Sequence, residues 1–314
     1  MDVRRSPLAR HGRAIALATL ALPLLLTRGA AQDAAPATPA SVAESLLAAD
    51  RAASTQAADR PLRDSLPAMF RDDVIVPGAP GRLYRGLDAV RAYLRESPDA
   101  EAHASWTPIR AGVSADGRHG FTFGFMTVTR ADRTTTPLKY MAYWTREDGA
   151  WRVAGYKRAR RPDGEAALTV MAPLLPARLV APTTDAVVRE RQRASLVAAE
   201  RAFSDRAQRI GLGAAFREFG APTAVNMGGP ASVPYVVGND AVAALIGGNS
   251  PQPTSPVEWS TDVALVASSG DLGISFGFIR PNANAPDGTA SPGSPFFTIW
   301  HRASADAPWR YVAE

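Results

Sequence analysis

The stretch FRDDVIVPGAPGRLYRGLDAVRAYL, residues 70–94, contains the clearest structural signals in this chain of 314 residues. The β-branched residues between Asp73 and Val76 predict a short strand, and the Pro/Gly-rich residues 77–81 predict a turn that ends it. The Asp-Ala-Val block at residues 88–90 then predicts a short helix. This segment therefore predicts a strand that turns directly into a helix.

The same pattern recurs about 150 residues later in the chain. Residues 45–54 (SLLAADRAAS) match residues 195–204 (SLVAAERAFS), 86–94 (GLDAVRAYL) match 238–246 (GNDAVAALI), and 116–125 (DGRHGFTFGF) match 269–278 (SGDLGISFGF). Tryptophans continue the match, Trp106 with Trp259, Trp144 with Trp300 and Trp151 with Trp309. We therefore expect two copies of one domain, residues 40–160 and 185–314, joined by a Pro/Ala-rich linker, residues 161–184.

Each copy is predicted to begin with a helix and to continue with strands. The residues Ser41 to Glu44 have the spacing of a capping box, and Asp185 can cap the first helix of the second copy. A buried helix face is predicted in the second copy by apolar residues at steps of three or four, namely Leu196, Ala199, Phe203, Ala207 and Ile210. After the short strand and short helix, three alternating strands are expected, with a bulge or a sharp bend at Gly124 and at Gly277. This order indicates an α+β fold whose sheet curls around its own apolar face.

Residues 70–94 resemble the segment that marks nuclear transport factor 2-like domains, the superfamily of ketosteroid isomerase and the SnoaL-type polyketide cyclases. The resemblance rests on an aromatic residue, an acidic pair, a β-branched strand, a Pro/Gly turn and a helix that opens with Gly, any residue, an acid and Ala. Residues 143–153 (YWTREDGAWRV) resemble the last hairpin of the family. In the second copy, residues 219–223 (FGAPT) replace the acidic stretch. The resemblance implies tandem cone-shaped α+β barrels, each a highly curved, mostly antiparallel sheet wrapped on its amino-terminal helices around a pocket.

The first 31 residues have the order of a secretory signal peptide. Basic residues from Arg4 to Arg13 precede an apolar run from Ala14 to Leu26, and the small residues before Gln32 predict cleavage after Ala31. The run is shorter than the roughly 20 residues that span a bilayer and contains Pro23. We therefore expect an exported protein, periplasmic or extracellular, with an Ala/Pro/Thr/Gln linker at residues 32–39. The export route, general secretory or twin-arginine, stays open.

The charge of the chain does not indicate an anionic partner once the signal peptide is removed. The full chain has a formal charge of +5, but residues 1–31 contain five of its arginines and only one acid. The mature chain is therefore expected to be nearly neutral, which gives no support for nucleic-acid binding. The chain contains no cysteine, so disulfides, a thiol nucleophile and a thiolate zinc site are excluded.

The sequence predicts no catalytic residue, metal or cofactor. In ketosteroid isomerase-like members an Asp two residues after the last β-branched residue of the strand acts as base, and the resemblance places this position at Gly78 and Met227. Neither residue can take a proton. The acids Asp72 and Asp73 are expected to be solvated. The three histidines His103, His119 and His301 are not spaced as metal ligands, and none has a residue of ligand type three or four positions after it. His119 is expected in an exposed turn, and His301 is expected to face away from Trp300.

Aromatic residues at alternating positions suggest a ligand pocket in each copy. The candidate pocket residues are Trp106, Phe123, Phe125, Tyr140, Trp144, Trp259, Phe276, Phe278, Phe296 and Trp300. The alternative is that these side chains fill the core between sheet and helices.

Three functions stay open at this point. The first is non-catalytic binding of a small hydrophobic molecule by the two fused copies, which would form a pseudo-dimer within one monomeric chain. The second is an enzyme of the cyclase, isomerase or dehydratase type that uses a pocket acid or base outside the family positions. The third is a structural duplication with filled pockets. An apolar cavity would favour binding, whereas a buried carboxylate that faces a Tyr or His would favour the enzyme.

Overall fold

The computed structural model describes residues 1–2, 37–228, 233–248 and 252–314, and its compact unit begins at Ala37. Apart from residues 1–2, the predicted signal peptide lies outside the described residues, as does most of the predicted linker that follows it. No helix within the described ranges is long and apolar enough to cross a membrane.

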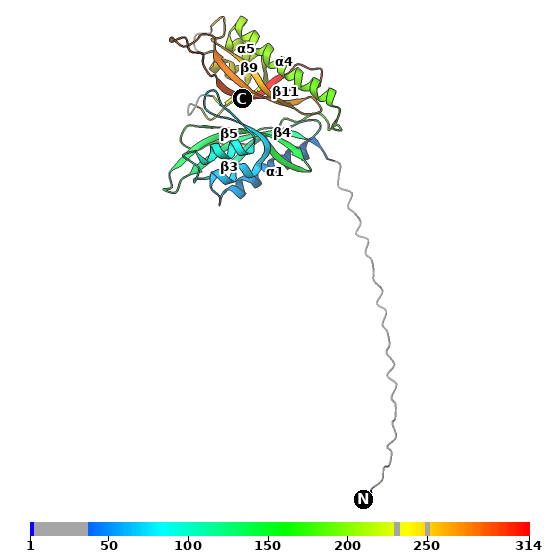
Figure 1. The fold of residues 1–314 in the computed structure, drawn as a ribbon. Helices are drawn as coiled ribbons and strands as arrows, with labels where there is room; N and C mark the ends of the chain where they lie inside the picture. Colours follow the sequence, from blue (N-terminus) through cyan, green and yellow to red (C-terminus); the bar gives the residue numbers. More distant parts are fainter. Residues whose placement is uncertain (3–36, 229–232, 249–251) are drawn as a thin grey trace. The chain divides into compact units, whose positions relative to one another are not determined.

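The first copy combines three helices and a short 3-10 helix with a six-stranded mixed sheet (Figure 1). Its elements are α1 (Pro39–Ala57), α2 (Leu62–Ser65), η1 (Pro67–Met69), β1 (Phe70–Pro77), β2 (Leu83–Arg85), α3 (Leu87–Arg95), β3 (His103–Val113), β4 (His119–Thr129), β5 (Thr135–Glu147) and β6 (Ala150–Arg160). The strand order is β2-β1-β6-β5-β4-β3. Strands β1 and β6 are parallel, and the other neighbours are antiparallel.

The second copy repeats this architecture. Its elements are α4 (Ala186–Ile210), α5 (Leu212–Phe219), β7 (Gly220–Asn226), β8 (Val236–Val237), α6 (Asn239–Gly247), β9 (Val257–Val266), β10 (Leu272–Pro281), β11 (Ser294–His301) and β12 (Arg310–Ala313). The strand order β8-β7-β12-β11-β10-β9 is that of the first sheet, with one parallel pair at the same place. The predicted α+β class and the tandem duplication are thus confirmed.

Helix and strand boundaries differ from the predictions in two places. Helix α1 is capped by Thr38, whose side chain accepts from the Ser41 N–H, so the capping box lies three residues before the predicted one because Pro39 occupies the first helical position. The predicted cap at Asp185 is confirmed, since its side chain accepts from the N–H groups of Val187 and Val188. Four strands follow the short helix α3 instead of three, because the chain after the Gly149 turn continues as β6.

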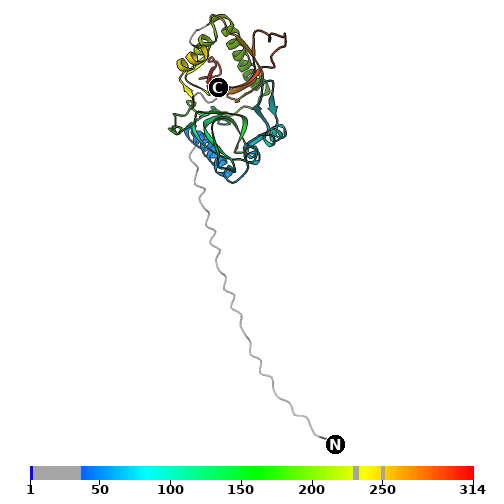
Figure 2. The ribbon, with the colours of Figure 1, turned by 90° about the vertical axis from the view of Figure 1, so that its left-hand side faces the viewer.

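The bulges predicted at Gly124 and Gly277 are present at equivalent places in the two sheets. The register of β3 on β4 shifts opposite Gly124, and that of β9 on β10 shifts at Gly277. A Cβ atom at either glycine would collide with a backbone carbonyl of the neighbouring strand, that of Thr107 or Ser260. A side chain is therefore excluded where each sheet bends, and Figure 2 shows the sheets curling around their own helices.

Both faces of each sheet are buried. One face packs on the helices of its own copy, around Leu46 and Trp144 in the first copy and around Leu196 and Trp300 in the second. The opposite faces of the two sheets contribute to one shared cluster, whose largest members are Phe121, Phe123, Phe125, Met141, Tyr143, Phe276 and Phe297. The two copies therefore pack sheet against sheet within one chain.

Candidate binding site

A buried acid lies at the same position of the first helix in each copy. Asp50 of α1 and Glu200 of α4 are 0% and 1% exposed. Each accepts a hydrogen bond from the matching tryptophan, at 2.7 Å from Trp106 Nε1 to Asp50 Oδ1 and at 2.7 Å from Trp259 Nε1 to Glu200 Oε1. Neither acid is among the residues predicted from the sequence. The signal that could have found them is the alignment of the two copies, which places an acid four residues after a buried leucine in both.

The interior of the first copy is almost completely filled. The Tyr140 hydroxyl donates to Asp50 Oδ2 at 2.7 Å, and the Tyr140 ring stacks 6.3 Å from that of Tyr156. Tyr156 in turn packs against Phe70. Burial raises the pKa of Asp50, while the hydrogen bonds from its neighbours act in the opposite direction. The cavity next to Tyr156 measures only about 40 Å³.

The interior of the second copy keeps a larger cavity. Phe296 stands where the first copy has Tyr140, and Glu314 stands where it has Tyr156. The resulting cavity measures about 120 Å³ and lies beside Glu200. Its wall is formed by apolar side chains, one threonine and two acids, namely Phe203, Leu212, Phe216, Ile246, Val257, Trp259, Ile279, Phe296, Thr298, Glu200 and Glu314.

The two acids of this cavity differ in their hydrogen bonding. Glu200 is fully engaged, because its Oε2 also accepts from Trp300 Nε1 at 2.9 Å and from the Ser275 hydroxyl. Glu314 Oε2 is buried and has no hydrogen-bond partner among the described residues. The backbone of Glu314 is fixed by two bonds to β7 and the residue after it, from its N–H to Val225 O at 3.0 Å and from Met227 N–H to its carbonyl at 2.7 Å. The wall of the cavity thus includes an acid with a fixed backbone and a buried Oε2 that is unpaired among the described residues.

The first copy places a cation near this acceptor. Lys157 on β6 pairs in register with Met141, a residue of the cluster between the sheets, so both side chains lie on the face that meets the second copy. Burial raises the pKa of Glu314 to about 7, and the charge of Lys157 partly opposes this effect. Burial also lowers the pKa of Lys157. The protonation state of the acceptor in the second copy therefore depends on a residue of the first.

Glu314 should give the protein a stability that falls as the pH rises. The folded-state pKa of about 7 lies above the ordinary value of 4.5, so between these values the folded state holds a proton that the unfolded state has lost. Glu314→Gln should flatten this part of the profile and be more stable than the wild type by about 1–3 kcal/mol at pH 8. Urea unfolding of both proteins from pH 4.5 to 8 measures the difference. Parallel profiles would show that Glu314 is ionised throughout.

The structure separates the ten predicted pocket residues into different environments. Trp259 and Phe296 line the cavity of the second copy, and Trp300 bonds to Glu200 at its edge. Trp106, Tyr140 and Trp144 belong to the filled core of the first copy. The remaining four lie elsewhere: Phe123, Phe125 and Phe276 pack in the cluster between the sheets, and Phe278 lies under the Arg280 guanidinium.

The other residues singled out in the sequence can also be located. Gly78 lies in the turn after β1 against the Tyr84 ring, and the buried Met227 follows β7, so neither family position carries an acid. Asp72 and Asp73 are exposed, as predicted. The prediction for His119 is wrong, because it begins β4 with its Nδ1 2.9 Å from the Tyr143 hydroxyl, and burial lowers its pKa to about 4.

The remaining histidines lie apart from the cavity. His103 is exposed, and its Nδ1 lies 3.0 Å from the Ala58 carbonyl oxygen. His301 is half-buried near Asp271, and burial lowers its pKa. No group of three or more acids or histidines that could hold a metal occurs within the described residues.

Comparison with known families matches residues 52–154 to the SnoaL-like domain. The matched range lies within the first copy, and the second copy repeats the strand order of the first. No curated protein matches the chain.

Each of the following solved structures aligns with a part of this chain that is about as long as one copy. An NTF2-like protein of unknown function from Pseudomonas putida KT2440 is 15% identical, with 44% of this chain and 100% of that chain covered and a TM-score of 0.32. A ketosteroid isomerase-like protein from Erwinia carotovora atroseptica is 21% identical, with 36% and 95% covered and a TM-score of 0.29. An NTF2-like protein from Novosphingobium aromaticivorans is 17% identical, with 40% and 92% covered and a TM-score of 0.31.

Proposed function

We propose that the second copy binds a small, mostly apolar molecule in its interior cavity. The observation that carries this proposal is the 120 Å³ cavity lined by Glu314, a residue whose buried Oε2 has no hydrogen-bond partner among the described residues. A cavity of about 150 Å³ with apolar walls binds benzene, so the volume fits a ligand of roughly one ring. The first copy then serves as a scaffold, since its own interior is filled by Tyr140 and Tyr156.

The ligand should carry one hydrogen-bond donor. Burying a carboxyl group without a partner costs free energy, and a donor on the ligand would remove that cost. The indole and hydroxyl donors next to Glu200 are already used by that residue, so they are not free to bind a ligand. A hydroxyl or amine on an otherwise apolar ring satisfies both features of the cavity.

Benzyl alcohol is a suitable probe of this site. We expect it to raise the melting temperature of the protein, with about 1.4 kcal/mol of added stability when its concentration is ten times the Kd. Toluene, which lacks the donor, should bind more weakly. Phe296→Trp should remove the effect of both compounds by filling the cavity, and Glu314→Gln should reduce the preference for the alcohol. Thermal-shift titrations of the three proteins measure these differences.

The first copy supplies a matched control for this experiment. Tyr156 stands at the position of Glu314, and its hydroxyl lies 3.7 Å from Met126 Sδ. Tyr156→Phe should therefore leave the response to benzyl alcohol unchanged. The proposal fails if no apolar ring compound shifts the melting temperature, or if Phe296→Trp responds like the wild type.

A second function is favoured by the ionisation of the same acid. A carboxyl group with a pKa near 7 in an apolar cavity suits proton transfer at neutral pH. The first copy also has a buried carboxylate that faces a tyrosine, Asp50 with Tyr140, but that pair lies in a filled core. If Glu314 transfers protons, hydrogen exchange in D₂O next to the carbonyl of cyclohexanone should be faster with the wild type than with Glu314→Gln. Equal rates would leave binding as the function of the site.

We also propose that the two domains comprise residues 40–160 and 185–314, that the protein is exported with cleavage after Ala31, and that the chain is a monomer. The shared cluster between the sheets supports the last point, because it already covers the sheet face of each copy. Amino-terminal sequencing of the mature protein and light scattering test the cleavage site and the mass. A mature chain that does not begin at Gln32, or a mass of two chains, would contradict these proposals.

A further inference from the structure

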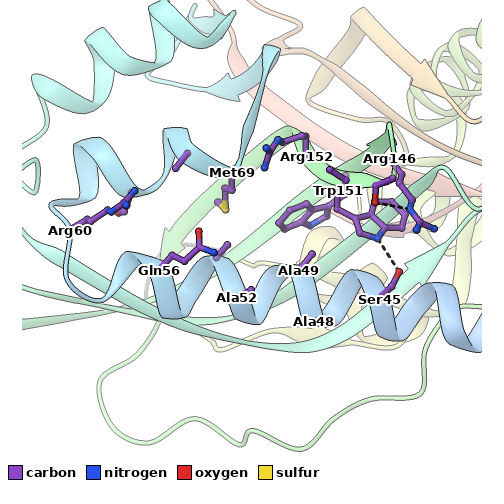
Figure 3. A pocket seen from close by; sticks show the side chains of 16 residues that line it. Ser45, Ala48, Ala49, Ala52, Gln56, Arg60, Met69, Arg146, Trp151 and Arg152 are labelled. Carbon is purple, nitrogen blue, oxygen red and sulfur yellow. Dashed lines mark hydrogen bonds between the residues drawn. The ribbon is translucent and has the colours of Figure 1, made fainter. Parts of the chain in front are cut away.

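A second hollow lies on the outside of the first copy, between α1 and the turn that joins β5 to β6 (Figure 3). This groove measures about 480 Å³, within the usual range of ligand pockets. Its wall on α1 is formed by four small side chains, Ala48, Ala49, Ala52 and Ala53, together with Ser45 and Gln56. The facing wall contains Met69, Trp144 and Trp151, and the Trp151 indole is held by a 3.1 Å hydrogen bond from its Nε1 to Ser45 Oγ.

In the second copy, aromatic side chains occupy two positions that are not aromatic in this groove. Ala53 corresponds to Phe203, and Met69 corresponds to Phe219. The rings of Phe203 and Phe219 stack at 4.9 Å, and Phe203 also packs 6.0 Å from Trp300, the equivalent of Trp144. The same scaffold therefore accommodates stacked aromatic rings at this place, and the first copy lacks the side chains that would supply them.

The charge of the groove is entirely positive. Arg60, Arg146 and Arg152 line it, and no acid does. Figure 3 shows Arg60 and Arg146 toward opposite ends of the groove, with Arg152 between them. Within the described ranges none of the three forms an ion pair with a carboxylate, whereas Arg63 and Arg71 on neighbouring segments do. Because no carboxylate of the described residues neutralises these three guanidinium groups, their charge remains available to a ligand. Guanidinium groups recognise anions through several donors at once.

We propose that this groove binds a planar aromatic anion. Its ring system would lie over Ala53 against Trp144 and Met69, in the space that Phe203 fills in the second copy, and its acidic group would meet the arginines. The site is independent of the cavity proposed above, because the two share no residue and carry opposite charge.

The substitution Ala53→Phe tests the site with the second copy's own side chain. With 8-anilinonaphthalene-1-sulfonate as probe, the wild type should show a saturable fluorescence increase with one site per chain. Ala53→Phe should weaken this binding at least tenfold. Ala202→Phe, which places the same ring on the exposed face of α4, is the matched control and should bind like the wild type.

The arginines are tested separately with a variant that leaves the core untouched. Arg60→Gln/Arg152→Gln changes two exposed residues and should weaken binding of the sulfonate about three- to tenfold, with a smaller dependence on salt. Binding of the neutral N-phenyl-1-naphthylamine should be unchanged. If Ala53→Phe does not fold, this double variant decides the question. Binding that neither substitution weakens, or that phenylnaphthylamine loses equally in the arginine variant, would overturn the proposal.

Discussion

Replacing Asp50 by Ala should lower the free energy of unfolding by about 2–4 kcal/mol. The substitution removes the carboxylate oxygens that accept from two buried donors, the Trp106 indole N–H and the Tyr140 hydroxyl. Each buried donor left without a partner costs about 1–3 kcal/mol. Urea unfolding followed by tryptophan fluorescence measures the loss. A loss below about 0.5 kcal/mol would show that water replaces the carboxylate and that the interior of the first copy is not closed.

The amide variants of the two acids should differ, although their positions are equivalent. In Asp50→Asn the carbonyl can still accept from Trp106, and the NH₂ can donate to the Tyr140 hydroxyl, which is able to reverse its role. The two carboxylate oxygens of Glu200 face the indole N–H groups of Trp259 and Trp300, which only donate. In Glu200→Gln the NH₂ group replaces one of these oxygens and faces an indole that cannot accept from it. We therefore expect Glu200→Gln to cost about 1–2 kcal/mol more than Asp50→Asn. Equal losses would contradict the hydrogen-bond assignments at Glu200.

The fold could be predicted from the sequence because its signals are local and occur twice. The Pro/Gly turn after Val76 and the glycines at 124 and 277 each specify a backbone feature without reference to distant residues. The match between the copies then fixed which features belong together. The fourth strand was missed because its boundary depends on the pairing of residues after Trp151 with β5, which the local pattern does not show.

The candidate site was harder to predict because it depends on which face of each sheet packs on the helices and which face packs on the other copy. Alternating aromatics such as Phe123 and Phe276 predict one buried sheet face, but here both faces are buried and the alternation does not say which face meets the helices. The acids were overlooked because Asp and Glu are usually exposed. Glu314 was overlooked as well, although the match of Trp151 with Trp309 places it opposite Tyr156, because its burial depends on the side chains that pack around it.

The cluster between the two sheets should be the most sensitive part of the molecule. Phe276 is fully buried there, and Phe276→Ala should cost about 3–5 kcal/mol because the cluster cannot close over the lost ring. Leu245→Ala is a suitable control, because Leu245 is 42% exposed and should cost below about 1 kcal/mol. Similar losses for the two variants would mean that the sheets separate in solution.

Gly155 on β6 of the first copy allows the contact between the two sheets to be tested from the first sheet. A Cβ atom on Gly155 would lie 2.6 Å from the ζ carbon of Phe276, so Gly155→Ala should cost about 1–3 kcal/mol through overpacking. Phe276→Leu shortens the opposing side chain and makes room for that methyl group. The double variant should therefore be more stable than the sum of the single effects predicts, by about 0.5–2 kcal/mol. Additive losses in urea unfolding would show that Gly155 and Phe276 do not touch, and hence that the sheet faces of the two copies are not packed together.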